Sequence, residues 1–128
     1  MTDVATALYQ FWSGFGLPAY VEGYIPDSAD GNGAPITLPY ITYQLSAPEW
    51  RSNAFYYARV WYRSTSYSGI TAKIKEISDR IGEGISIPID GGMLVLYKSD
   101  NFCQFQPFED DSTIKMAYIS MQLNVYTE

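Results

Sequence analysis

The segment AFYYARVWYR, residues 54–63, limits the possible folds of this chain more than any other stretch. It alternates with the two-residue period of a β-strand, and one of its faces carries Tyr56, Ala58, Val60 and Tyr62. The opposite face carries Phe55, Tyr57, Arg59, Trp61 and Arg63. A strand that turns one face to water does not place aromatic rings at every second position of that face. We therefore expect helices on one face, and a second sheet, long loops or a neighbouring subunit on the other.

Two other segments have the period of amphipathic helices. Residues 3–15 bring apolar side chains to one side, with Thr2 as a plausible N-cap and Gly16 and Pro18 as the stop. Residues 67–82 bring four isoleucines to one stripe, with Ser66 or Ser68 as the expected cap. Both stripes are typical of helices that pack on a hydrophobic core.

The remaining patterned segments predict strands. They cover residues 19–26, 38–46, 86–89, 93–98, 102–108 and 114–126, with a D-G-G turn at 90–92. The last strand has the clearest alternation, and its core face is Ala117, Ile119, Met121, Leu123 and Val125. Most of the gaps have hairpin length, so the sheet should be mainly antiparallel. The predicted fold class is α+β, with two α-helices packed on one face of the sheet in a single domain, 1–128. The predicted order is α-β-β-β-α-β-β-β, with one short extra strand among the last segments as the alternative.

Composition excludes several classes of site. The chain has no histidine and one cysteine, so the usual Cys/His zinc sites, histidine-dependent triads and an internal disulfide are ruled out by count. The net charge of −6 comes without a basic run, which argues against nucleic acid as the main ligand. No segment resembles a secretion signal or a membrane span. We expect neither an enzyme nor a cofactor, and a reducing compartment is compatible with the single thiol.

Three polar features were weighed as sites. The loop at 27–35 holds Asp27, Asp30 and Asn32 but lacks the spacing and closing glutamate of a calcium loop. Glu22 is the one acid inside a predicted strand, and we expect it to be an outward-facing charge. Cys103 lies in an apolar strand with no base near it in sequence, which predicts an inert, buried thiol.

Twelve tyrosines, an unusually large number, suit a surface that is buried only on association. A tyrosine-rich β-protein without a partner would show the same composition. Exposed tyrosine and tryptophan also occur in carbohydrate-binding modules, which is the alternative function. The helical third of the chain and the missing secretion signal argue against that alternative, and open Tyr57 and Trp61 rings would favour it.

The chain as a whole resembles the tail terminator, or tail completion, proteins of long-tailed bacteriophages. The resemblance rests on the order of the elements and on the stretches PYITYQLS, ARVWYRSTSY, ITAKIKEISDRIGEG and KMAYISMQLNVY. It covers nearly all of the 128 residues. Other small neck and tail-tube proteins of phages have similar stretches and remain an alternative.

The resemblance implies a structural role in the virion, after assembly in the host cytoplasm. Such proteins form a ring, usually of six subunits, that caps the tail-tube protein and docks to the head–tail connector protein. No cofactor is implied, and DNA passes through the lumen without sequence-specific binding. A closed ring uses different patches on each subunit. The predicted interface is Tyr57, Arg59, Trp61 and Arg63 on one side, with opposing charge from Asp27, Asp30, Glu109, Asp110 and Asp111 on the other.

Overall fold

The computed structural model describes residues 3–23, 36–45, 54–108 and 111–127. These residues form two helices and a six-stranded sheet, in the predicted α+β class. In chain order the elements are α1 (Val4–Ser13), β1 (Ala19–Val21), β2 (Tyr40–Tyr43), β3 (Ala54–Arg63), α2 (Ser68–Ile81), β4 (Ile85–Ile89), β5 (Gly92–Phe108) and β6 (Asp111–Thr127).

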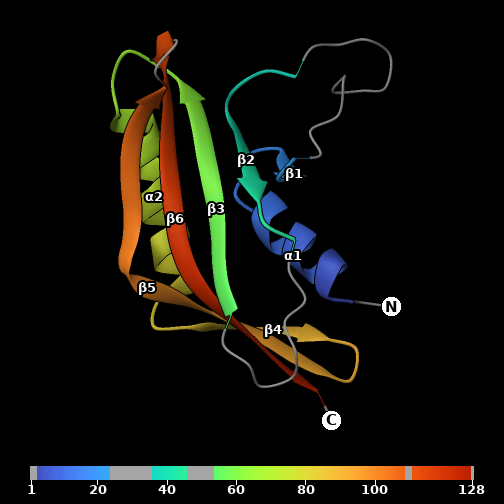
Figure 1. The fold of residues 1–128 in the computed structure, drawn as a ribbon. Helices are drawn as coiled ribbons and strands as arrows, with labels where there is room; N and C mark the ends of the chain where they lie inside the picture. The colour runs from blue at the N-terminus through green and yellow to red at the C-terminus, as the bar shows by residue number, and fades with distance from the viewer. Residues whose placement is uncertain (1–2, 24–35, 46–53, 109–110, 128) are drawn as a thin grey trace.

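The sheet has the strand order β1-β2-β3-β6-β5-β4, and its long central strands are β3, β6 and β5 (Figure 1). Every pair of neighbouring strands is antiparallel except β1 and β2, which run parallel. Ala58 lies opposite Ile119 and Val60 opposite Ala117, so the apolar face of β3 meets the apolar face of β6. The predicted order and the mainly antiparallel sheet are confirmed.

The N-cap of helix α1 is Asp3, one residue later than the Thr2 cap that the sequence suggested. The Asp3 carboxylate, not a Thr2 hydroxyl, accepts a hydrogen bond from the Thr6 backbone N–H at 2.8 Å. This bond satisfies one of the free N–H groups of the first turn and holds the pKa of Asp3 below its usual value. The helix buries Leu8, Phe11 and Trp12 on the sheet.

Helix α2 buries Ile70, Ile74, Ile77 and Ile81, as the stripe predicted. The predicted serine cap is wrong, because the N-cap is Tyr67 and its side chain makes no capping bond. The helix ends at Gly82, whose φ of 57° lies in the left-handed region that favours glycine. Lys73 ties the two helices together by donating to the Phe15 carbonyl oxygen at 2.6 Å.

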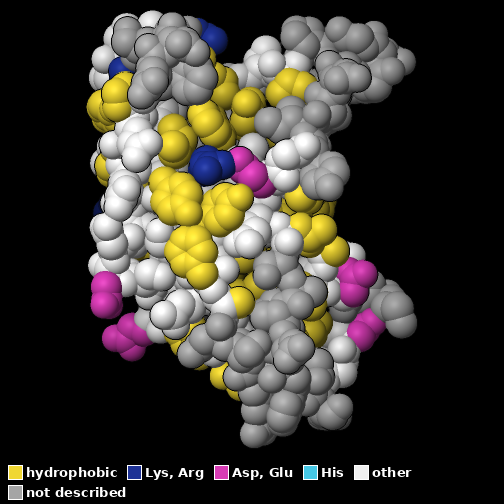
Figure 2. Space-filling model, viewed as in Figure 1, with side chains coloured by type: hydrophobic (Ala, Val, Ile, Leu, Met, Phe, Trp, Pro, Cys, Tyr) yellow, Lys and Arg dark blue, Asp and Glu magenta, His cyan; other side chains and the backbone are white. Residues whose placement is uncertain are grey.

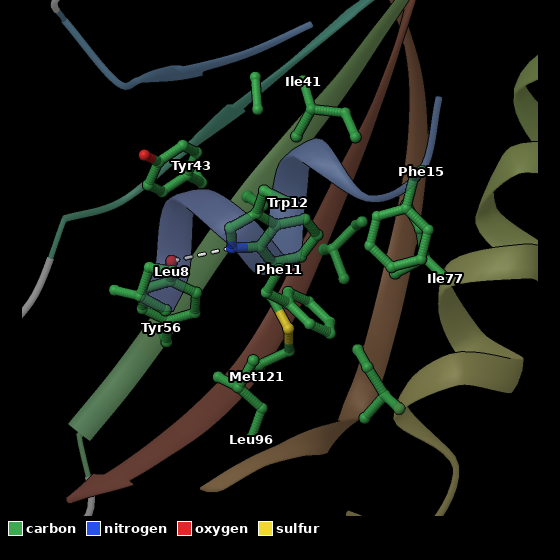
Figure 3. Packing of buried hydrophobic residues seen from close by; sticks show 14 of the residues in the cluster. Leu8, Phe11, Trp12, Phe15, Ile41, Tyr43, Tyr56, Ile77, Leu96 and Met121 are labelled. Carbon is green, nitrogen blue, oxygen red and sulfur yellow. Dashed lines mark hydrogen bonds between the residues drawn. The ribbon is translucent and has the colours of Figure 1, made fainter. Parts of the chain in front are cut away.

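The core lies between the helices and one face of the sheet (Figure 3). At its centre Trp12 packs with its ring 6.5 Å from those of both Tyr43 and Tyr56. The Trp12 Nε1–H donates to the Tyr56 hydroxyl at 3.0 Å, so both buried polar groups have a partner (Figure 3). Met121 and Leu96 complete this layer from β6 and β5 (Figure 3).

Strand β5 corrects the prediction of two separate strands at 93–98 and 102–108, because the chain runs through both as one strand. Its register against β6 shifts between Lys98, opposite Met121, and Cys103, opposite Ile119. The step from Lys98 to Cys103 is five residues on β5 but only two on β6. Strand β5 therefore holds three extra residues in a large, irregular bulge. Polar residues 99–101 in this bulge gave the appearance of a turn in the sequence.

Candidate functional site

The face of the sheet turned away from both helices is called here the outer face. It carries the second row of β3, namely Phe55, Tyr57, Arg59, Trp61 and Arg63, and its neighbours on β1, β2 and β6. Figure 2 views this face and shows hydrophobic side chains gathered around one basic and one acidic group in contact. Neither helix covers the outer face, which therefore remains open where the described residues are concerned (Figure 1).

Arg59 is the centre of the outer face. Its guanidinium forms an ion pair with the Glu22 carboxylate on the loop that follows β1. It also lies over two tyrosine rings, 5.1 Å from the centroid of Tyr57 and 5.5 Å from that of Tyr118. Those two rings stack on each other with centroids 5.5 Å apart. The Arg59 side chain is 28% exposed and that of Glu22 is 25% exposed, so both charges are largely withdrawn from water.

Only one of the two carboxylate oxygens of Glu22 has a hydrogen-bond partner among the described residues. Its Oε1 accepts from Arg59, whereas its Oε2 is buried and finds no hydrogen-bond partner within the part of the chain that the structure describes. The carboxylate also helps to raise the pKa of the Tyr40 hydroxyl, although burial of that hydroxyl is the larger cause. A buried acceptor on an open face is a place where a donor from another molecule would be stabilised.

A second aromatic group continues the outer face toward the edge of the sheet. The Trp61 Nε1–H donates to the Thr42 hydroxyl at 2.9 Å. The Trp61 ring lies 6.4 Å from that of Tyr40, which in turn meets Tyr20 edge-on at 5.7 Å. These contacts occupy the Trp61 N–H and part of the three rings, so the aromatic side chains hold one another in place.

At the other end of the outer face, Phe55 is 58% exposed. It borders a shallow, open groove of about 610 Å³ that lies beside the β5 bulge. The groove is lined by Phe55, Lys98, Ser99, Asp100, Asn101, Ser120 and Gln122.

The structure brings the four predicted interface residues of β3 to one face. Tyr57 and Trp61 are half-buried, Arg59 is ion-paired, and Arg63 is exposed and donates to the Thr113 hydroxyl at 3.0 Å. Four of the predicted opposing acids lie outside the described residues, namely Asp27, Asp30, Glu109 and Asp110. Asp111 begins β6, where the structure describes its backbone only.

Glu22 is the site residue that sequence reasoning missed. It was expected to face solvent, but it pairs with Arg59, which is 37 positions away. The parallel pairing of β1 with β2 produces this contact, because it places Tyr20 opposite Thr42, which is opposite Arg59. The signal in the sequence was the opposite charges of Glu22 and Arg59, each in a predicted strand rich in aromatic residues.

The described residues give little support for a catalytic or metal-binding site. They contain no group of three or more potential metal-ligating side chains, and no helix among them is long and apolar enough to cross a membrane. Cys103 is half-buried rather than fully buried as expected, and burial raises its pKa to about 11, which disfavours the reactive thiolate near neutral pH. The carbohydrate alternative required open Tyr57 and Trp61 rings, and both are partly covered by their neighbours.

Comparison with known proteins gives one informative match. Neither a protein-family profile nor a curated protein sequence matches this chain. Among solved structures, the fold is similar to a chain in a structure described as "Virion of native gene transfer agent (GTA) particle", with a TM-score of 0.67. The superposition covers 95% of this chain and 93% of that chain, at 14% sequence identity. At this identity the likeness establishes that the two chains share a fold over nearly their whole lengths.

Proposed function

We propose that this chain is a structural protein of a phage or phage-like virion. The observation that carries the proposal is the shared fold, over 95% of this chain, with a component of a gene transfer agent virion, which is a phage-like particle. Particles of this kind are built from many protein subunits, and a subunit needs surfaces for its neighbours rather than a reaction site. The open outer face and the lack of a catalytic or metal-binding cluster among the described residues agree with that requirement.

Within the virion, the proposed role is that of a tail terminator. The subunits form a ring, six in number by the resemblance, that caps the tail-tube protein and joins it to the head–tail connector. The sequence resemblance to tail terminators supports this position, and the shared fold with a virion chain is compatible with it. The net charge of −6 supports a lumen through which DNA passes without adhering.

The outer face supplies a contact with a partner protein of the virion. Tyr57, Arg59 and Trp61 are fixed in place by stacking and hydrogen bonds, so little side-chain entropy is lost when they are covered. Aromatic residues and arginine are also the types enriched at protein interfaces. Arg63 lies exposed at the end of the row, where it already donates to the Thr113 hydroxyl.

The proposal is tested by assembly on purified tail tubes. The chain is mixed with tubes of its own phage and viewed by negative-stain electron microscopy, while light scattering gives the mass of the free protein. We expect a ring at one end of each tube and no further elongation after its addition. Binding along the whole tube would contradict the terminator role, and no binding to tubes, connectors or particles would contradict a structural role altogether.

A matched pair of variants separates the outer face from general loss of solubility. Phe55→Asp places a charge on an aromatic side chain that is 58% exposed on the outer face. Tyr9→Asp makes the same change at a side chain that is 52% exposed on α1. The first should weaken binding to purified tail tubes at least tenfold, and the second should leave that binding within twofold of the unmodified protein. Equal effects of the two variants would remove the outer face from the interface.

A further inference from the structure

One edge of the sheet is left without a partner strand along most of β5, from Tyr97 onward. Strand β4 pairs only with Gly92–Leu96 of β5, so the later part of β5 is an edge where the described residues are concerned (Figure 1). Cys103–Pro107 is the part of this edge that keeps a regular register with β6. It carries no charge and no residue that blocks pairing before Pro107, unlike the edges that proteins protect against association.

The hydrogen-bond pattern shows which backbone groups of this edge point outward. The Ser64 N–H donates to the Thr113 carbonyl, so Thr113 and every second residue after it turn their backbone toward β3. Met116 and Tyr118 therefore turn toward β5, where they lie opposite Gln106 and Gln104. It follows that Cys103 and Phe105 direct their N–H and C=O groups away from the sheet.

Pro107 agrees with this assignment. It falls on the same alternation as Cys103 and Phe105, and proline has no N–H to lose at an outward position. The bulge before Cys103 and the missing donor at Pro107 limit the pairing edge to the three residues Cys103–Phe105. A partner strand for this edge therefore needs only three residues.

The opposite edge of the same sheet has matching properties. Strand β1 is three residues long, Ala19–Val21, and pairs on one side only within the described part of the chain. The Ile41 N–H donates to the Pro18 carbonyl and the Glu22 N–H donates to the Tyr43 carbonyl. Successive residues of a strand direct their backbone groups to opposite sides. Since Pro18 and Glu22 turn theirs toward β2, Ala19 and Val21 have their N–H and C=O groups pointing outward.

The directions of β5 and β1, and the sides of the sheet on which their side chains lie, also fit a pairing of the two edges. Repeating the subunit sideways brings β5 of one copy beside β1 of the next as antiparallel strands, because the strands between them set opposite directions. Cys103 and Phe105 lie on the helix side of the sheet, as do Ala19 and Val21. Gln104 and Tyr20 lie on the outer side.

We infer that the β5 edge of one subunit pairs antiparallel with β1 of a second copy, with Cys103 opposite Val21, Gln104 opposite Tyr20 and Phe105 opposite Ala19. The outward groups then form four hydrogen bonds, and the outer faces of adjacent subunits become continuous. The choice of β1 rather than a second β5 rests on the proposed ring, because head-to-tail closure requires two different patches.

Disulfide trapping tests the inference in a Cys103→Ser background. Gln104 and Tyr20 would form a non-hydrogen-bonded pair, with Cα atoms about 4.5 Å apart, which falls within the range of a disulfide. Mixing the single variants Gln104→Cys and Tyr20→Cys should give a cross-linked dimer that neither variant gives alone. Ser86→Cys, on β4, is the control and should not cross-link to Tyr20→Cys.

A proline substitution, which removes a backbone N–H, provides an independent test of the pairing. Phe105→Pro removes one outward N–H, and Phe105→Ala removes the same side chain while keeping that N–H. Both should keep the monomer fold by circular dichroism, but the proline variant should associate at least tenfold more weakly than the alanine variant. Equal association of the two variants would overturn the pairing.

The outcomes separate this inference from the proposed function. Self-linking of Gln104→Cys alone would show two-fold β5 pairing and overturn the inference. Rings seen by light scattering without any cross-link between positions 20 and 104 would overturn the edge pairing and leave the ring intact. A protein that stays monomeric, even with tail tubes present, and forms no cross-link would overturn both.

Discussion

The ion pair between Arg59 and Glu22 should stabilise the outer face, and a double-mutant cycle measures its contribution. The side chains are 28% and 25% exposed, which places the pair between a surface salt bridge and a buried one. A charge-assisted hydrogen bond contributes about 1.5–3 kcal/mol, and an exposed ion pair contributes less than about 1 kcal/mol. After allowance for solvent screening, we expect a coupling free energy of about 1–2 kcal/mol between Glu22→Gln and Arg59→Ala.

The single variant Arg59→Ala should lose more than this coupling. It also removes the two contacts with Tyr57 and Tyr118, each of which contributes about 0.5–1 kcal/mol. The total loss is therefore about 2–4 kcal/mol. Unfolding entropies of about 2.1 cal/mol/K per residue imply a fall in Tm of about 4 °C per kcal/mol for this length, or roughly 8–15 °C.

The assay is thermal and urea unfolding of the four proteins of the cycle, followed by circular dichroism. Lys75→Ala is the control, because Lys75 and Asp79 form an i,i+4 pair whose side chains are 76% and 68% exposed. The Lys75→Ala substitution should lower the free energy of unfolding by about 0.3–0.5 kcal/mol. An Arg59→Ala variant no less stable than this control, or a coupling below about 0.3 kcal/mol, would refute the reasoning.

Two further predictions concern the core and the thiol. Tyr56→Phe leaves the buried Trp12 N–H without its acceptor and should lower the free energy of unfolding by about 1–3 kcal/mol, measured by urea titration. A Tyr56→Phe protein as stable as the original would show that this hydrogen bond contributes nothing. Because burial raises the pKa of Cys103 from 9.0 to about 11, alkylation of the folded protein at pH 8 should be roughly 100-fold slower than that of an unfolded control. Its rate should rise with pH up to about 11, and equal rates for the two proteins at pH 8 would contradict the assignment.

The regular parts of the fold were predictable because each has a single strong period. The alternation of 114–126 identified the core face of β6, and the isoleucine stripe identified the buried side of α2. The two faces of β3 were separated correctly for the same reason. In these segments local pattern and tertiary packing favour the same structure, so one sequence is sufficient.

The errors arise where a local signal competes with the rest of the fold. The polar residues of the β5 bulge indicated a break, but cross-strand pairing with β6 on both sides keeps the strand continuous. Ser66 and Ser68 are good capping residues, yet Tyr67 occupies the cap of α2. Its ring packs against Phe105 at 5.9 Å, a tertiary contact that the sequence does not reveal.

The candidate site was predicted in part. The row of β3 was identified from its alternation, whereas the partner of Arg59 was not, since Glu22 reaches it only through the parallel pairing of β1 and β2. Parallel pairing of short strands depends on the path of the whole chain and leaves no local pattern. The pairing edges of β1 and β5 became visible only from the hydrogen-bond alternation across the complete sheet.

The most direct measurement of the central claim is immunogold labelling of intact phage or phage-like particles from the source of this chain's gene. A structural role as tail terminator predicts label at a single position, the junction of head and tail, on most particles. Label along the length of the tail would contradict the terminator role. Particles that are complete and infectious but carry no label would contradict the claim that this chain is part of the virion.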